Sequence, residues 1–296
     1  MGAYGDDGLL ETNSDDDFAS TLLHSYNLEP GPTHDASSSQ NADVMKASSI
    51  TDTGVQQAKI VDRDASAATE IITETYYTLA CHGASILLER DPFAGTGGLL
   101  WPAGERLAMH LCRVATQDPS RFANKRIIEL GTGTGVVGIA MAMTTDLGKE
   151  GLLVLTDLDP VLPIVKRNIA LNGCSPSRVT VERLAWGEAL PSLFKASEGH
   201  PVDVVVMADV IYHEDLFQPL LDTLLYLFQA NPGMVGYLGY KKRRRADWLF
   251  QKSLRRTFEM RLLEEVQPVC IEQVHSKDER WRQGVYLYEL TLRSPS

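Results

Sequence analysis

RIIELGTGTGVVGIAMAM, residues 126–143, is the most informative segment of this chain. A short apolar run contains the acid Glu129, and glycines follow at alternate positions, Gly131, Gly133 and Gly135. An apolar, alanine-rich segment comes next, so the order is typical of a strand, a tight turn and a helix N-terminus. Glycine permits positive φ, and the first helical turn has unpaired N–H groups. The segment therefore predicts a site for a nucleotide-like cofactor.

Length and composition predict one sizeable α/β domain with additional segments. The chain has 296 residues, of which 44% are hydrophobic and 23% charged. No apolar run approaches the ~20 residues that a membrane span needs, and the N-terminus lacks a signal-peptide pattern. Four cysteines without a CxxC pair predict reduced, buried thiols rather than disulfides or a metal site. We expect a cytoplasmic protein, with the nucleus as the alternative, and no metal and no membrane partner.

The charge is concentrated at one end of the chain. Residues 1–70 hold 13 acids and three bases, which gives -10 of the total net charge of -11. This segment is rich in Ser, Asp, Ala and Gly and shows little apolar periodicity, so it predicts a largely disordered acidic tail. Residues 71–296 would form the folded domain. Because that domain is nearly neutral, binding to nucleic acid through bulk charge is not expected.

Apolar segments of two kinds alternate along the domain. Strand-like runs lie at 126–130, 152–157, 178–184, 203–208 and 234–240, and helix-like runs at 136–145, 160–172, 215–230 and 246–257. Strands that alternate with helices predict a mainly parallel sheet covered on both faces. Two further runs, 260–267 and 284–293, have no helix between them and predict an antiparallel end to a seven-stranded sheet.

The residues before this alternation predict a hairpin, a loop and a helix. Residues 75–90 contain two β-prone runs around His82-Gly83, which indicates a β-hairpin. A glycine-rich loop, DPFAGTGG, follows and leads to LLWPAGERLAMHLCRV. The apolar spacing of this last segment indicates an amphipathic helix.

The glycine turn alone leaves the cofactor open. Gly133, Gly135 and Gly138 satisfy GxGxxG, the dinucleotide pattern, and Asp157 ends the second strand of the alternation. An acid at that place can bind a ribose diol in an NAD enzyme or in a methyltransferase. An NAD-linked oxidoreductase therefore remains an alternative on these residues.

Three features favour a methyltransferase. Glu129 suits the ammonium group of S-adenosylmethionine, or a supporting backbone network, and suits a pyrophosphate poorly. The second feature is the antiparallel end of the sheet, and the third is the segment around Asp209.

Four motifs then carry a resemblance that extends over most of residues 75–296. They are GGLLWPAGERLAMHL (97–111), IIELGTGTGVVGIAMA (127–142), LAWGE (184–188) and VMADVIYHEDLFQPLLDTL (206–224). The domain resembles the eukaryotic seven-β-strand protein-lysine methyltransferases, whose members act on elongation factor 1-alpha, the p97-type AAA ATPase and Hsp70. The resemblance implies a Rossmann-like seven-stranded methyltransferase sheet and S-adenosylmethionine as cofactor.

The resemblance also implies which residues bind the cofactor. By position, the family's contacts fall on Trp101, Gly131, Thr132, Gly133, Asp157, Trp186 and Ala208. Asp157 could accept bonds from the ribose hydroxyls, and Trp186 could pack on the adenine face. Trp101 offers an indole N–H and a wall near the pocket mouth. Glu129 is a further candidate, either as a direct ligand or as a support for the turn.

The family's Asp-x-x-Tyr falls on Asp209 and Tyr212, just past the fourth strand of the alternation. Ligands of open α/β sheets bind outside the carboxyl ends of the strands, where the glycine turn and Asp157 also lie. The resemblance implies that Asp209 helps to hold the substrate lysine and that Tyr212 lines its channel. Whether Asp209 acts as a base or only positions the amine stays open.

The resemblance thus implies a protein-lysine N-methyltransferase, with elongation factor 1-alpha as the favoured substrate, and we expect a monomer. The alternatives are another protein substrate, a small-molecule or nucleic-acid methyltransferase on the same fold, and a non-enzymatic scaffold. The basic run at 241–245 could be a solvated helix start, a nuclear-import signal or a patch that docks the substrate.

Overall fold

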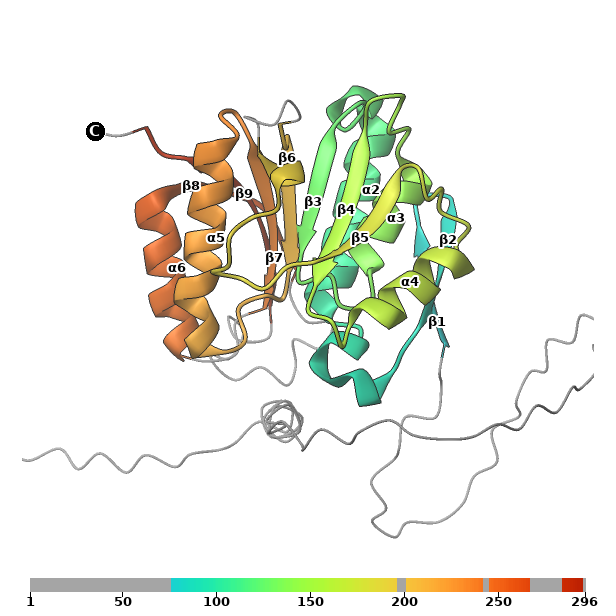
Figure 1. Ribbon diagram of the computed structural model, residues 1–296, viewed down its shortest axis with the longest axis horizontal. Coiled ribbons are helices and arrows are strands. Elements are labelled where there is room, and N and C mark those ends of the chain that lie inside the picture. Colours follow the sequence, from blue (N-terminus) through green and yellow to red (C-terminus); the bar gives the residue numbers. More distant parts are fainter. Residues whose placement is uncertain (1–75, 196–200, 242–244, 267–283, 295–296) are drawn as a thin grey trace, which may run out of the picture. The chain divides into compact units, whose positions relative to one another are not determined.

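The computed structural model describes residues 76–195, 201–241, 245–266 and 284–294 (Figure 1). The tail predicted for residues 1–70 lies outside the described residues, as do residues 242–244 of the basic run. In the described part of the chain, no helix is both long enough and apolar enough to cross a membrane.

Seven strands form the central sheet in the order β5-β4-β3-β6-β7-β9-β8. Their bounds are β3 Arg126–Leu130, β4 Leu152–Asp157, β5 Val179–Arg183, β6 Val204–Ala208, β7 Val235–Lys241, β8 Phe258–Val266 and β9 Val285–Leu292. The pairs among β3 to β7 are parallel, whereas β9 runs antiparallel to both β7 and β8. The predicted α/β sheet with an antiparallel final strand is confirmed, and that strand lies between β7 and β8.

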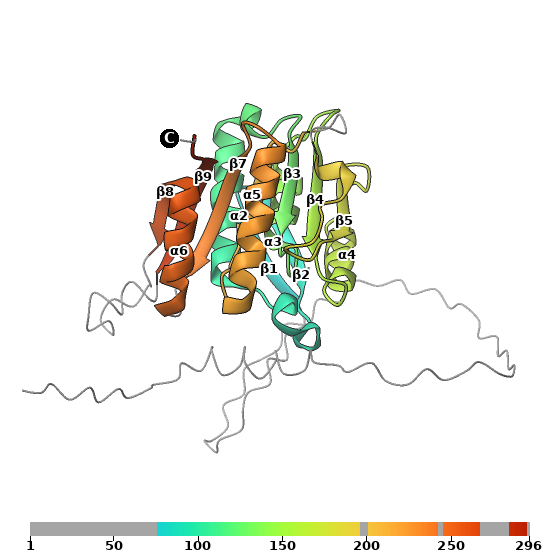
Figure 2. The ribbon, with the colours of Figure 1, turned by 60° about the vertical axis from the view of Figure 1, so that its left-hand side comes forward.

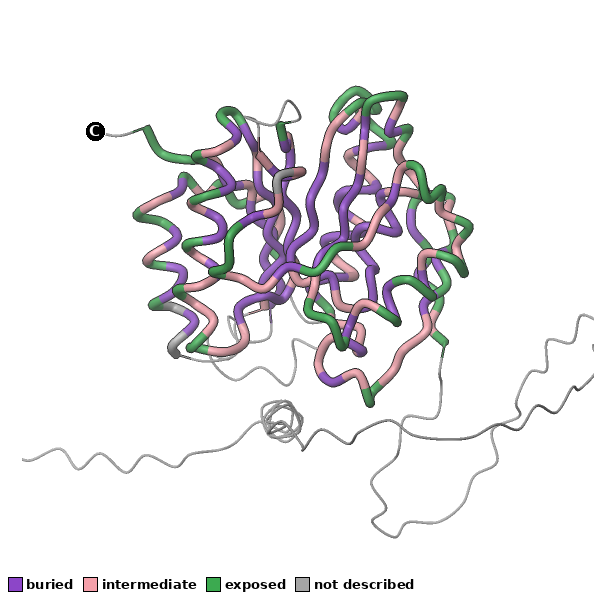
Figure 3. Tube along the Cα trace, in the orientation of Figure 1, coloured by how far each residue is buried: buried purple, intermediate pink, exposed green. Residues whose placement is uncertain are grey.

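Helices cover both faces of this sheet (Figures 1 and 2). On one face lie α2 Pro102–Gln117, α3 Val136–Thr144 and α4 Leu162–Leu171, and on the other lie α5 Phe217–Ala230 and α6 Arg245–Thr257. Adjacent strand residues serve different cores, since Ile127 packs with the first set and Ile128 with the second. Strands with both faces covered are apolar throughout, which explains the buried centre in Figure 3.

The predicted hairpin is also confirmed. β1 Tyr76–Cys81 pairs antiparallel with β2 Ala84–Glu89, with Cys81 opposite Ala84. His82 and Gly83 form the two-residue turn with φ of 44° and 91°, the left-handed conformation that tight hairpin turns require. The hairpin packs against α2, α3 and α4, and the Tyr77 hydroxyl donates to Glu105 of α2.

Short 3-10 helices occupy several connections. They are η2 Pro92–Gly98, η3 Pro119–Arg121, η4 Ser192–Phe194 and η6 Glu214–Leu216. The glycine-rich segment predicted as a loop is therefore two 3-10 turns with a kink at Gly95, whose φ is 68°. Asp91 caps this helix, because its carboxylate accepts a bond from the Phe93 N–H.

Candidate active site

Three neighbouring parallel strands bring the predicted site residues to one edge of the sheet. The glycine turn follows β3, Asp157 is the last residue of β4, and Ala208 is the last residue of β6. Asp209 continues from β6, and its N–H donates to the Gly239 carbonyl of β7 at 2.9 Å. The carboxyl edge of an open parallel sheet is where such folds bind ligands.

Backbone hydrogen bonds within the turn and to β4 hold the glycine turn in a left-handed conformation. Gly131, Gly133 and Gly135 have φ of 62°, 56° and 84°. The Thr132 N–H donates to the Thr156 carbonyl at 3.0 Å, and the Gly135 N–H donates to the Thr132 carbonyl at 2.8 Å. Residues other than glycine adopt such φ angles only at a cost in free energy. This backbone conformation therefore favours glycine at the three alternate positions.

Two side chains from distant segments pack directly on Gly131. A Cβ atom added there would lie 3.0 Å from Cζ2 of Trp186 and 3.1 Å from Cγ1 of Val210. Trp186 comes from the turn after β5, which is anchored to α5 by a bond from the Gly187 N–H to Thr223 Oγ1 at 2.8 Å. The indole predicted to face the adenine therefore lies beside the glycine turn and remains half-buried.

The Glu129 side chain supports the glycine turn through hydrogen bonds. Its side chain is buried, and its Oε2 accepts bonds from Thr132 Oγ1 at 2.8 Å and from the Gly138 N–H at 3.0 Å. A Cβ at Gly138 would lie 2.5 Å from that oxygen, so a glycine is needed for the carboxyl group to reach α3. Of the two roles predicted for Glu129, the structure shows the supporting one. Its direct contact with a cofactor stays a prediction.

This buried carboxyl group makes stability depend on pH. Burial raises the pKa of Glu129 from 4.5 to about 8, although the bonds from Thr132 and Gly138 oppose the shift. Between these values the folded chain holds a proton that the unfolded chain releases, so stability falls as pH rises from about 4.5 to about 8. We expect Glu129→Gln to melt at a less pH-dependent temperature than the wild type. If the Tm of the two proteins changed equally with pH between pH 6 and pH 9, this expectation would be contradicted.

Asp157 is bound to the glycine turn. Its Oδ2 accepts a bond from the Gly133 N–H at 2.9 Å, and its Oδ1 accepts one from the Leu158 N–H at 2.8 Å. Burial raises the pKa of Asp157, and these two bonds oppose the shift. Each carboxylate oxygen carries two lone pairs, so Asp157 keeps the capacity to accept bonds from two hydroxyl groups.

The segment around Trp101 lies against the other side of the turn. A Cβ at Gly133 would be 3.2 Å from the Gly97 carbonyl oxygen, so η2 closely approaches the glycine turn. Trp101 is half-buried at the N-terminus of α2, and its indole N–H donates to the Thr96 carbonyl at 2.9 Å. The indole N–H predicted to be offered at the pocket mouth thus stabilises the fold of η2.

The residues after β6 adopt an unusual backbone conformation. Asp209 has a φ of 55° and is 8% exposed. Aspartate tolerates the left-handed region better than most residues, and such a conformation is often found at functional sites. Val210 follows and contacts the Gly131 position, whereas Tyr212 lies half-buried before η6. The structure therefore places the Asp-x-x-Tyr segment beside the glycine turn.

One residue at this site escaped the sequence analysis. Asn168 of α4 is fully buried, and its Nδ2 donates to the Thr134 carbonyl of the glycine turn at 2.8 Å. The available signal was an asparagine on the apolar face of a helix, where a polar side chain needs a partner.

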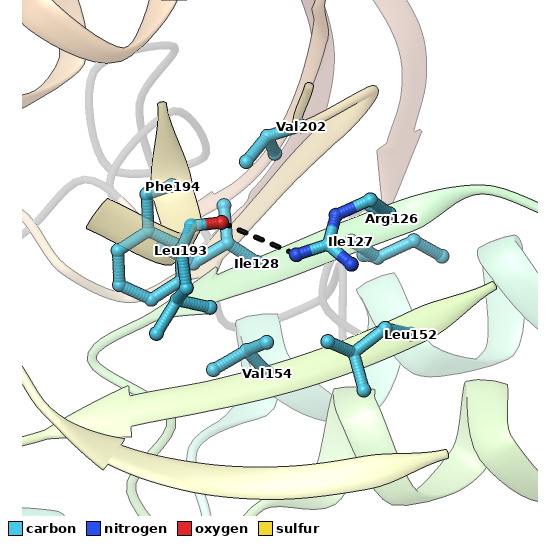
Figure 4. Close-up of a pocket in the computed structure, with 8 residues that line it drawn as sticks. All are labelled: Arg126, Ile127, Ile128, Leu152, Val154, Leu193, Phe194 and Val202. Carbon is cyan, nitrogen blue, oxygen red and sulfur yellow. Dashed lines mark hydrogen bonds between the residues drawn. The ribbon is translucent and has the colours of Figure 1, made fainter. Parts of the chain in front are cut away.

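Other parts of the described chain offer no competing centre. Among the described residues, no group of three or more His, Cys, Asp or Glu side chains could hold a metal ion. A small hollow at the start of β3 and β4 is mainly apolar, and Arg126 donates across it to the Leu193 carbonyl at 3.2 Å (Figure 4). It lies at the amino ends of the parallel strands, so it is separate from the edge that carries the glycine turn.

Comparisons with known proteins agree with this geometry. A family model described as lysine methyltransferase matches residues 82–257. Protein-lysine N-methyltransferase EFM6 of Saccharomyces cerevisiae is 36% identical over 56% of this chain and 72% of its own length. EEF1A lysine methyltransferase 3 of Mus musculus is 29% identical over 76% of this chain and 91% of its own length. Protein N-lysine methyltransferase METTL21A of Xenopus tropicalis is 32% identical, over 60% and 72%.

The family model covers more than half of the chain, and the match includes the glycine turn, Asp157 and Asp209. The oxidoreductase and scaffold alternatives are therefore set aside. The chain belongs to the lysine methyltransferase family, and it is an enzyme that transfers a methyl group from S-adenosylmethionine to a protein lysine.

Proposed function

We propose that this enzyme methylates a lysine of elongation factor 1-alpha. The observation that carries the proposal is the alignment with EEF1A lysine methyltransferase 3 of Mus musculus, which spans 91% of that protein. The p97-type AAA ATPase and Hsp70 are the alternative protein substrates.

The chemistry of the turn supports a place for the cofactor. The two ribose hydroxyls of S-adenosylmethionine need acceptors, and Asp157 carries a carboxylate at the glycine turn. Adenine needs a flat apolar wall, and the half-buried Trp186 indole lies against Gly131. We place the methionine portion at Gly131, Thr132 and Gly133. The neighbouring residues Glu129, Trp101 and Ala208 complete this part of the proposed site.

Asp209 and Tyr212 are then the residues nearest to the incoming lysine. The cofactor supplies an activated methyl group when bound, so the chain has to position a neutral amine and exclude water. The free amine has a pKa of about 10.4 and arrives as an ammonium. A carboxylate attracts that ammonium, whereas burial favours the neutral amine. We assign Asp209 to holding the side chain and Tyr212 to lining its channel, with the proton lost to water.

The substrate assignment is tested with purified proteins. Elongation factor 1-alpha from cells that lack this enzyme is incubated with the enzyme and S-adenosylmethionine that carries a labelled methyl group. We expect label on one lysine, located by mass spectrometry, and a kcat/KM at least about tenfold above those for Hsp70 and a p97-type AAA ATPase. Label mainly in either of these proteins, or in nucleic acid, would contradict the proposal.

Two expectations from the sequence accompany this function. A cytoplasmic location and a monomeric state both stay predictions.

A further inference from the structure

Asn168 of α4 and Asn172, the residue that caps the C-terminus of this helix, pair with the outer edge of β2 as a neighbouring strand would. The Leu87 N–H donates to Asn172 Oδ1 at 2.9 Å, and Asn172 Nδ2 donates to the Leu87 carbonyl at 2.7 Å. The Glu89 N–H donates to Asn168 Oδ1 at 2.7 Å, and Asn168 Nδ2 donates to the Glu89 carbonyl at 3.1 Å. A carboxamide has one acceptor and a donor group, so it can replace a peptide unit.

The spacing of the two elements explains this match. Residues four apart on a helix rise by about 6 Å. Residues two apart on a strand rise by about 6.6 Å. Asn168 and Asn172 therefore meet Glu89 and Leu87 in register.

Only one of these two asparagines reaches the glycine turn in the described structure. Asn168 uses its Nδ2 group twice, once for Glu89 and once for the Thr134 carbonyl at 2.8 Å. Its side chain and that of Thr134 are both buried, so losing this bond would leave polar atoms unpaired away from water. Asn168 thus joins three elements: α4, β2 and the glycine turn.

The chain continues from β2 into the segment that contacts the glycine turn from outside. Arg167 pairs with Glu89 at 2.9 Å and with Asp91 at 3.6 Å, which holds the start of η2 against α4. Further along η2, the Gly97 carbonyl approaches Gly133. A shift of β2 relative to α4 would therefore move both sides of the turn.

We propose that Asn168 is a positioning residue for cofactor binding. Its carboxamide sets the position of the glycine turn relative to the hairpin and to the 91–101 segment. The inference rests on the proposed placement of the cofactor at that turn. Asn168 touches no reacting atom, so its loss weakens binding of S-adenosylmethionine and leaves kcat at saturating cofactor nearly unchanged.

The test compares Asn168→Ala with Asn172→Ala, which is the matched control. Both variants lose two bonds to β2, and we expect both to have a lower Tm. Only Asn168→Ala also loses the bond to Thr134. We expect it to raise the Kd for S-adenosylmethionine, measured by calorimetry, at least about tenfold, which corresponds to 1.4 kcal/mol. Asn172→Ala should change this Kd by less than about threefold.

A second variant keeps the test valid if Asn168→Ala does not fold. Asn168→Asp preserves the side-chain volume and the acceptor for the Glu89 N–H, but it cannot donate to Thr134 when ionised. A Kd equal to that of the wild type in either Asn168 variant that folds would overturn the proposal. Hydrogen exchange of residues 131–135 then identifies the failed step. Faster exchange with an unchanged Kd would show that the cofactor does not bind at the glycine turn. Unchanged exchange would show that Asn168 does not hold this turn in position.

Discussion

Replacing Asp209 with asparagine is expected to abolish most methyl transfer and to leave cofactor binding intact. Asparagine has nearly the same size and also tolerates a φ of 55°, so the backbone after β6 should persist. The change removes the negative charge that would hold the lysine ammonium in a site where Asp209 is 8% exposed. Charge-assisted hydrogen bonds away from water contribute strongly, so we expect kcat/KM for the protein substrate to fall at least about 100-fold.

The matched control for this variant is Asp215→Asn. Asp215 follows six residues later in η6, and its side chain is 90% exposed. It carries the same charge near the same segment, but it lies in water, where such a charge contributes little. We expect its kcat/KM to stay within about twofold of the wild type. Equal losses in both variants, or an Asp209→Asn enzyme with full activity, would refute the assigned role of Asp209.

The pH dependence of the same pair of enzymes separates positioning from proton abstraction. If Asp209 only positions the lysine, activity of the wild type should keep rising with pH as the amine loses its proton to water. Asp209→Asn should then show the same slope at a lower level. A wild-type activity that stays level over the pH range in which the activity of Asp209→Asn rises would instead assign Asp209 as the base.

The second large effect is expected for Gly131→Ala. The new Cβ would lie 3.0 Å from the Trp186 ring and 3.1 Å from Val210, so at least one of these side chains must move. Trp186 forms the proposed adenine wall, and Val210 follows the proposed lysine-binding Asp209. We therefore expect the Kd for S-adenosylmethionine to rise at least about 100-fold, a loss of roughly 2.7 kcal/mol in binding. Calorimetry measures this directly.

Gly173→Ala is a closely matched control for backbone strain. Gly173 has a φ of 61°, against 62° for Gly131, but a Cβ there would meet nothing within 4 Å. Both variants carry the left-handed cost of about 1–2 kcal/mol, so both should have a lower Tm. Only Gly131→Ala adds the contact with Trp186 and Val210. If the two variants bound the cofactor equally well, the close packing at Gly131 would not matter for binding.

Most elements of the fold could be predicted because their signals are local. The predicted strand at 152–157 is β4 with the same bounds, and His82-Gly83 is the hairpin turn. Period-two and period-3.6 patterns, together with glycine chemistry, act within a few residues. The predicted loop before α2 was less accurate, since η2 forms there, with Asp91 as its N-cap.

The candidate site was predictable where a residue follows directly from its strand end. Asp157 and Asp209 end or follow parallel strands that lie on the two sides of β3, so their common edge follows from topology. The partners of Glu129 and of the Trp101 indole N–H were not predictable. Each depends on how a side chain is oriented after helices and turns have packed.

The local chemistry of the sequence was sufficient for the α/β class, the glycine turn and the edge of the sheet at which Asp209 lies. The tertiary structure alone showed that the Trp186 and Val210 side chains pack against Gly131. It also showed that Asn168 connects β2 to Thr134. The two Asn168 contacts join residues that are 34 and 79 positions apart in the sequence. Period and turn patterns carry no information over such separations, because long-range contacts are set by the packing of whole elements.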